Sequence, residues 1–371
     1  MFRPAVLIAF ACLFALGCAG GGAAPPAAAP PPAAAPPKVA QAPAGASPAA
    51  SAPAPATKGA APTPAATCKD AKTTWRIAGE AVRPNQIIVW ADRFKELIEQ
   101  RTNCQISILV FQGGVLGTSK QTIEQVRLGS LELAMIVSDM PELYPAYGAL
   151  DLPFIFRDRA HAVAVLDGPI GKRLNEEMIK TKGVRSLGYG ELGIRHVTNS
   201  VRPITKPDDL KGLKIRVPPS KLRVRTFEIF GAAAPPIPSS EMYTALQARV
   251  ADGQENPLSS AFSFSLWEVQ KYVSLTGHIY SPVFPLTNEK TFQKLSPEFQ
   301  KLVLDTSQEI AVWHRKESEK ADIEFLKKLQ EKGMMVNEVN PADFQRQAAQ
   351  VWAEFAEPIG QELINSIVNT K

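Results

Sequence analysis

The sequence predicts an α/β protein, because strand-like and helix-like segments alternate through most of the chain. The strand-like segment TTWRIAG, which starts at Thr73, is followed by a helical apolar pattern over residues 85–102 and by the strand-like segment QISILVF from Gln105. Roughly 300 residues follow the N-terminal low-complexity region, which is long for one hydrophobic core. We therefore expect a βαβ opening and more than one lobe.

The following segments continue the alternation. SKQTIEQVRLGS predicts a helix that ends at Gly129, and LELAMIVS predicts a third strand. Further on, GVRSLGYG and GLKIRVP are strand-like, whereas AHAVAVLDG, LRVRTFEIFG and SSEMYTALQARV are helix-like. The C-terminal third is dominated by helices. Residues 297–333 form a periodic stretch that is too long for an ordinary globular helix and could be interrupted once.

The first residues have the pattern of an export signal. Arg3 supplies a basic start, and the apolar run over residues 5–16 is shorter than the roughly 20 residues that span a bilayer. The tetrapeptide ALGC, which ends at Cys18, approximates a lipobox, in which the cysteine is lipidated and becomes the mature N-terminus. We expect a signal peptide over residues 1–17 and a lipid on Cys18. Simple secretion with cleavage nearby is the alternative.

Residues 18–66 consist almost entirely of alanine and proline with scattered glycine and serine. Such a segment has little apolar surface to bury, so it cannot offset the entropy of ordering. We expect a disordered tether. If its prolines stiffen it toward polyproline II, its reach is on the order of 100 Å. Compositional bias of a GC-rich genome would explain the same segment without a function.

The four cysteines can all be assigned. Cys12 leaves with the signal peptide, Cys18 is the expected lipid site, and Cys68 and Cys104 remain for a disulfide in an oxidising compartment. Cys68 precedes the first predicted strand and Cys104 opens the second. Parallel strands joined by one helix start at the same edge of a sheet, so the two sulfurs could meet. Two free thiols are the alternative.

Composition and motifs argue against several classes of function. The net charge of +5 is ordinary, and no basic run is interleaved with aromatic residues, so we expect no nucleic-acid partner. The GxGxxG pattern at 188–193 is not followed by a helix, and the glycine-rich segment 113–120 lacks the closing Gly-Lys-Ser/Thr. No GxSxG elbow or metal-ligand spacing is present. We expect neither a cofactor nor a metal, and no catalytic residues.

Two arginines near an Asn-Pro pair predict an anion site. In GLKIRVPP, apolar residues alternate with Lys214 and Arg216, so a half-buried strand would place Arg216 near its carboxyl end. Arg195 lies in the apolar segment GIRHVTNS, and Asn256 precedes a proline in DGQENPLS. A guanidinium matches a carboxylate with two hydrogen bonds and stays charged when it is desolvated.

The same motifs carry a family resemblance. The chain from about residue 73 to about 352 resembles a solute-binding protein of a TRAP transporter of the dicarboxylate-receptor (DctP) type, through LPFIFRD, GIRHVTNSVRPI, DLKGLKIRVPPS, MYTALQARVADGQENPLS, WEVQKY and TGHIYSP. The resemblance implies that Arg216 binds the ligand carboxylate. It also implies that Arg195 assists and that Asn256 helps to fix the pocket.

The resemblance further implies a two-lobed periplasmic-binding-protein-like fold, type II-like, with mixed sheets flanked by helices and a long helix bracing both lobes. We expect lobe I to comprise residues 67–192 and 282–321. Lobe II would comprise residues 193–281 and 322–371, including the C-terminal helices. Such proteins close on a ligand by a hinge motion.

Additional ligand-binding residues are expected on loops beyond the first and third strands, namely Glu80, Arg83, Ser138 and Asp139. Ser239 stands where many relatives carry a bulky aromatic side chain, so the pocket floor would be wider or more polar. The motifs therefore do not fix the identity of the ligand.

Each arginine also has a purely structural alternative. Arg216 could pair with Glu255 or Asp252, and Arg195 could pair with the nearby Glu191. Asn256 could serve only to cap its loop, because the following proline restricts it to extended geometry.

Taken together, these features predict a lipid-anchored periplasmic receptor for a small organic acid anion. Its expected partners are the membrane subunits of a TRAP permease and, through the lipid, a membrane. Two alternatives remain open at the level of sequence. One is a ligand-sensing module for a membrane kinase, and the other is an enzyme that converts a carboxylate.

Overall fold

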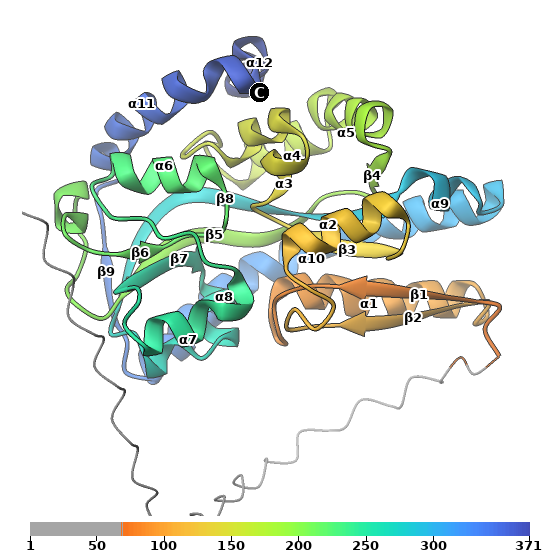
Figure 1. The fold of residues 1–371 in the computed structure, drawn as a ribbon, viewed down its shortest axis with the longest axis horizontal. Coiled ribbons are helices and arrows are strands. Elements are labelled where there is room, and N and C mark those ends of the chain that lie inside the picture. The colour runs from red at the N-terminus through yellow and green to blue at the C-terminus, as the bar shows by residue number, and fades with distance from the viewer. Residues whose placement is uncertain (1–67, 69) are drawn as a thin grey trace, which may run out of the picture. The chain divides into compact units, whose positions relative to one another are not determined.

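The computed structural model describes residue 68 and residues 70–371 (Figure 1). The expected signal peptide, Cys18 and the expected tether lie outside the described residues. Within the described part, nine strands form a mixed sheet in the order β2-β1-β3-β8-β5-β7-β6, with β4 and β9 also paired to β8. None of the helices in this part is long and apolar enough to cross a membrane.

The sheet has two groups of strands. In the first group, β1 (Thr73–Ala78) is parallel to β2 (Ile106–Phe111) and to β3 (Leu133–Ile136), as the βαβ opening predicted. The C-terminal part of β8 (Tyr272–Asn288) is antiparallel to β3 and to β4 (Val184–Ser186).

The second group contains the remaining strands. Here β5 (Gly190–Asn199) is antiparallel to β7 (Gly253–Pro257), and β6 (Ile215–Arg216) is parallel to β7. The N-terminal part of β8 pairs with β5 and with β9 (Met335–Glu338). Because β5 and β8 remain paired from one group to the other, they join the two groups.

The glycine at position 193 allows the irregular pairing at this junction. The register of β5 on β8 shifts between Glu191 and Gly193, and Gly193 has a φ of +128°. A Cβ atom at this position would lie 2.9 Å from a carboxylate oxygen of Asp322. The backbone conformation and the close approach both require glycine.

The helices pack on the two groups with the following bounds: α1 (Gln86–Arg101), α2 (Ser119–Leu128), α3 (Met140–Leu143), α4 (Arg159–Leu166), α5 (Pro169–Lys182), α6 (Lys221–Ile229), α7 (Met242–Gln247), α8 (Leu258–Ser263), α9 (Glu289–Gln293), α10 (Pro297–Glu331), α11 (Pro341–Ile359) and α12 (Gln361–Asn369). Short 3-10 helices are η1 (Pro145–Asp151), η2 (Pro207–Leu210), η3 (Ser239–Glu241) and η4 (Leu266–Glu268).

Helix starts and ends follow local sequence signals. The Asn85 side chain accepts a hydrogen bond from the Ile87 backbone N–H at 3.0 Å and caps α1. Thr118 and Gln121 form a reciprocal capping box at the start of α2. The helix ends at Gly129, as the sequence predicted, and this glycine adopts the left-handed conformation.

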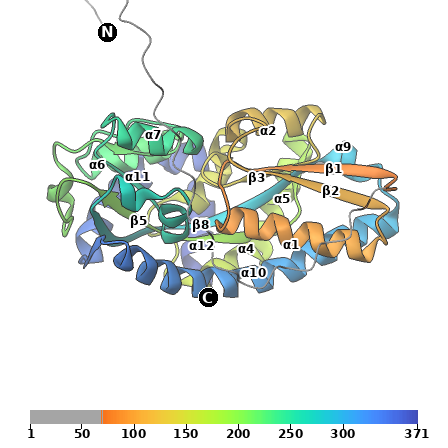
Figure 2. The same ribbon diagram turned by 90° about the horizontal axis from the view of Figure 1, so that it is seen from below.

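Helix α10 runs along both groups of strands, as Figure 2 shows. It packs against α1 of the first group, against β5, and against α8 of the second group. It is one continuous helix of 35 residues, so the interruption considered from the sequence is absent. Its length exceeds the usual range because its buried face contacts two separate cores rather than one.

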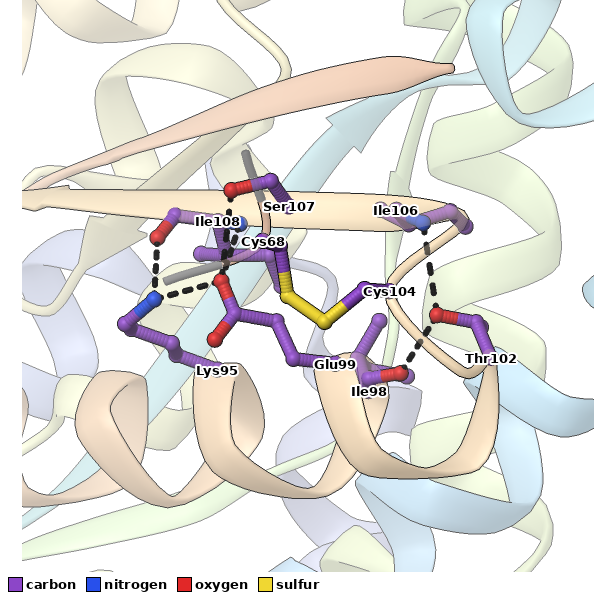
Figure 3. Close-up of a disulfide and its surroundings, with 9 residues drawn as sticks. All are labelled: Cys68, Lys95, Ile98, Glu99, Thr102, Cys104, Ile106, Ser107 and Ile108. Carbon is purple, nitrogen blue, oxygen red and sulfur yellow. Dashed lines mark hydrogen bonds and ion pairs between the residues drawn. A yellow bond between two sulfur atoms is a disulfide. The ribbon is translucent and has the colours of Figure 1, made fainter. Parts of the chain in front are cut away.

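A disulfide lies at the edge where β1 and β2 begin (Figure 3). Cys68 and Cys104 are joined with an S–S distance of 2.04 Å and a Cα–Cα distance of 5.1 Å. The parallel register pairs Thr73 with Ile106, which brings the residues before the two strands to the same edge. By the loop-entropy argument, a bond across a sequence separation of 36 residues stabilises the fold by about 3–4 kcal/mol.

Candidate functional site

The predicted site residues converge where the two groups of strands face each other. Each group contributes the carboxyl ends of two parallel strands, which is where open α/β sheets bind ligands: β1 and β3 from the first, β6 and β7 from the second. A cavity of about 40 Å³ lies there. Six of the eight predicted ligand-binding residues line it: Glu80, Ser138, Asp139, Arg195, Ser239 and Asn256.

Arg216 is a fully buried guanidinium whose charge has no carboxylate partner within the described chain. Its side chain is 0% exposed. Nε donates to the Ile237 carbonyl at 2.7 Å, Nη1 contacts Met242 Sδ at 3.5 Å, and Nη2 donates to the cavity-lining Ser239 Oγ at 3.2 Å. Burial lowers the pKa of Arg216 to about 10, so the group stays protonated at neutral pH.

Neither of the two carboxylates considered as partners of Arg216 pairs with it. The Glu255 carboxylate forms ion pairs with two other arginines, and Asp252 Oδ2 accepts a hydrogen bond from the Lys214 backbone N–H at 2.8 Å. A buried charge is normally paired, and one without a partner carries a large desolvation cost. Arg216 does not line the cavity itself and reaches it through Ser239, so its role as the carboxylate contact stays a prediction.

Arg195 differs from Arg216, because a carboxylate already holds it. Its Nε and Nη2 donate to the two carboxylate oxygens of Glu255 at 2.5 and 2.9 Å, and Nη2 also donates to Asn256 Oδ1 at 2.9 Å. The alternative partner Glu191 instead pairs with Arg159. Arg195 thus fixes the position of Asn256, and it is one of the residues that line the cavity.

Asn256 links the cavity wall to the surroundings of Arg216. Its Nδ2 donates to Gln254 Oε1 at 2.6 Å and contacts Met242 Sδ at 3.4 Å. Arg216 contacts the same sulfur. The side chain therefore does more than cap a loop, because it connects the two arginines through a shared neighbour.

Sequence reasoning missed a third buried arginine. Arg223, on α6, pairs bidentately with Asp151 at 2.5 and 3.1 Å and donates to Glu255 Oε2 at 3.0 Å. The sequence did contain a pattern that indicates a buried Arg223. Arg223 shares the i, i+4, i+7 stripe of α6 with two buried phenylalanines, Phe227 and Phe230, and an arginine on an apolar stripe must find a buried partner.

Glu255 is the centre of this ionic network. It is fully buried between Arg195 and Arg223, and His278 Nε2 lies 3.1 Å from its Oε2. Burial alone would raise the pKa of Glu255, but the two guanidinium groups and the histidine hold it well below its usual range. The network therefore sets two carboxylates, Glu255 and Asp151, against the two guanidinium groups of Arg195 and Arg223 in the wall between the two groups of strands.

The structure does not bring Arg83 to the cavity. Its guanidinium pairs with Asp92 at 2.5 Å, and its side chain is 46% exposed. Asp92 lies on α1. An ion pair with this exposed carboxylate costs less desolvation than a buried pair, so the Arg83 side chain turns outward. The expectation that Arg83 lies in the binding site is wrong for this arrangement.

Direct contacts between the two groups surround the cavity. Asn85 Nδ2 donates to Ser260 Oγ at 3.0 Å, and Ser240 Oγ donates to Glu80 Oε1 at 3.2 Å. A volume of about 40 Å³ has room for roughly three water molecules. A cavity of this size is too small to hold an organic acid.

A larger groove of about 800 Å³ lies beside the cavity, between residues of α2, α3, α6 and α11. Asp139 lines both the groove and the cavity. Across the described chain, no group of three or more histidine, cysteine, aspartate or glutamate residues could hold a metal ion.

Comparison with known proteins identifies the family. Residues 80–358 match the model of bacterial extracellular solute-binding proteins, family 7 (DctP). The chain is 38% identical over 252 residues to the 2,3-diketo-L-gulonate-binding periplasmic protein of Escherichia coli, covering 68% of this chain and 76% of that protein.

Solved structures agree with this match. A TRAP periplasmic solute-binding protein from a Polaromonas species, bound to D-erythronate, is 33% identical with a TM-score of 0.78 and covers 81% of this chain and 99% of that one. A protein from Sulfurospirillum deleyianum with bound succinate is 29% identical with a TM-score of 0.77 and covers 81% and 100%. These are binding proteins and not enzymes. The chain belongs to the bacterial extracellular solute-binding proteins of family 7, the DctP family.

Proposed function

We propose that this protein captures a small organic acid anion outside the cytoplasm and delivers it to a TRAP-type permease. The observation that carries the proposal is the buried guanidinium of Arg216, which has no anionic partner in the described chain. A ligand carboxylate would accept two hydrogen bonds from it, in place of the contacts to Ser239 and Met242. Family relatives with bound D-erythronate or succinate support a small carboxylate as the ligand.

The other predicted residues take supporting roles in this proposal. Arg195 and Asn256 shape the wall beside the carboxylate, and Ser239 offers a hydroxyl at the cavity floor. Glu80 and Ser138 lie on the loops of the first group of strands and would contact the rest of the ligand. Arg83 has no part in it.

We also propose a hinge motion between two lobes, residues 67–192 with 282–321 and residues 193–281 with 322–371. The support is that β5 and β8 join the two groups of strands near residues 190–193 and 281–283. A ligand that touches both lobes adds contacts to the closed state that the open state lacks, so binding favours closure.

The proposed function includes a periplasmic location. Family members are periplasmic. The Cys68–Cys104 disulfide suits an oxidising compartment, and the N-terminal pattern supports export and a lipid on Cys18. A lipid at that position with residues 18–66 as a tether would keep the receptor near its permease.

Native mass spectrometry of freshly purified protein tests the proposed function. We expect a retained organic acid, and the identified compound should stabilise the protein against thermal unfolding. At a hundred times its dissociation constant, a ligand adds about 2.7 kcal/mol to the free energy of unfolding. The proposal is wrong if no carboxylate is retained and none in a broad panel of organic acids raises the melting temperature.

A further inference from the structure

Asp139 is a second side chain at the cavity whose bonding is incomplete. It lies three residues beyond the end of β3 and directly before α3, and it is 7% exposed. Within the described chain its carboxylate accepts no hydrogen bond, including none from the start of α3. Buried carboxylates nearly always have such partners. Because Asp139 lines both the cavity and the adjoining groove, a molecule entering from the groove would meet it.

The neighbouring acid Glu80 is different, because the protein already satisfies it. Its Oε2 accepts hydrogen bonds from the Ser119 N–H at 3.0 Å and from Ser119 Oγ at 2.6 Å, and its Oε1 accepts one from Ser240 Oγ. Asp139 differs from Glu80 because no described residue donates a hydrogen bond to its carboxylate.

The charges that face Asp139 come from five elements. Glu80 after β1, Asp151 in η1 and Glu142 on α3 are like charges, whereas Arg216 on β6 and Arg223 on α6 are opposite. Burial, followed by the Glu80 charge, raises the pKa of Asp139 to about 7, although Arg216 acts in the other direction. A second ligand carboxylate near Asp139 would thus enter a region that already contains several negative groups.

We propose that Asp139 selects the end of the ligand opposite the carboxylate and that the ligand is a monocarboxylate with a hydrogen-bond donor, a hydroxyl or an ammonium, at that end. Dicarboxylates are disfavoured. This inference rests on the proposed function, because it takes the carboxylate end of the ligand to be held by Arg216. A donor supplies the hydrogen bond that Asp139 lacks, whereas a second carboxylate adds repulsion and supplies no donor.

Binding of a matched series of acids tests this selection. Chains of four, five and six carbons, each with one carboxylate, would carry a methyl, hydroxyl, ammonium or second carboxylate group at the far end. Affinity is measured by calorimetry at pH 8. At the chain length that binds best, we expect the hydroxyl or ammonium acid to bind at least about tenfold more tightly than the dicarboxylate. A preference for the ammonium over the hydroxyl would identify an amino acid ligand, and the reverse a hydroxy acid.

The variant Asp139→Asn separates this role from a general effect of charge. In the variant, we expect the preference for the hydroxyl or ammonium acid over the dicarboxylate to fall below about threefold. The amide removes the repulsion between two carboxylates and can itself donate a hydrogen bond. Asp305→Asn is the matched control, since it removes the same charge from an exposed position on α10. Asp305→Asn should keep the full preference for the hydroxyl or ammonium acid over the dicarboxylate.

A pH series gives an independent readout. In the parent protein, affinity for the dicarboxylate should rise as pH falls from about 8 to 6, because protonated Asp139 can donate a hydrogen bond to it. In Asp139→Asn this rise should be absent.

Two results would overturn the inference in different ways. If carboxylates bind but the dicarboxylate matches the donor-bearing acids, or if Asp139→Asn keeps the full preference, the role of Asp139 is wrong and the proposed function stands. If none of the acids binds at any length, the inference is wrong, and the proposed function fails with it only if no carboxylate in the broad panel raises the melting temperature.

Discussion

Replacing Arg216 with methionine is expected to weaken binding of the organic acid at least about a hundredfold, equivalent to roughly 2.7 kcal/mol. The variant keeps much of the side-chain volume but removes the cation. Because Arg216 has no carboxylate partner in the described chain, the unliganded protein should be as stable as the parent or more stable. Calorimetry with the retained ligand and thermal unfolding without it measure the two effects.

Arg195→Met is the matched control for this prediction. It also removes a buried guanidinium, but it leaves Glu255 with one arginine fewer, so it should destabilise the unliganded protein. Unchanged affinity in Arg216→Met would contradict the assignment of Arg216 as the carboxylate contact. A large loss of stability in the same variant would instead indicate a structural arginine.

Replacing Glu255 with glutamine is expected to destabilise the fold by about 3–5 kcal/mol, the usual cost of removing one partner from a buried ion pair. The change leaves the guanidinium groups of Arg195 and Arg223 close together without the carboxylate between them. Thermal or denaturant unfolding of the unliganded protein measures the loss. Glu319→Gln, an exposed substitution on α10, is the control and should change stability little.

The destabilisation should also depend on pH. The folded-state pKa of Glu255 lies well below its ordinary value of 4.5, so its charge contributes fully to stability above pH 4.5. That contribution is lost progressively as pH falls further, because the unfolded state then takes up the proton. The gap in stability between parent and Glu255→Gln should therefore narrow below pH 4.5. A gap of equal size at pH 3 and pH 7 would show that the charge of Glu255 is not its source.

The sequence predicted much of the fold because local signals and the sheet pattern agreed. Alternation in TTWRIAG and QISILVF with a helix between them gave the parallel pair β1–β2, and Pro218 and Pro219 marked the end of β6. The carboxyl ends of β1 and β3 place Glu80, Ser138 and Asp139 at the cavity. Such positions follow from backbone geometry alone, which a sequence pattern can encode.

Pairing between distant charged side chains could not be predicted in the same way. Glu255 could have paired with Arg216, yet it pairs with Arg195, which faces it from the neighbouring strand, and with Arg223 from a helix. Arg83 follows β1 closely, but its side chain turns to Asp92. These choices depend on side-chain reach and desolvation in three dimensions, and no local periodicity records them.

The most direct test of the account is a crystal structure of the protein with its retained ligand. We predict that both carboxylate oxygens lie within hydrogen-bond distance of the Arg216 guanidinium and that a donor on the other end of the ligand faces Asp139. A carboxylate bound elsewhere, with Arg216 still donating to Ser239 and to the Ile237 carbonyl, would contradict the account.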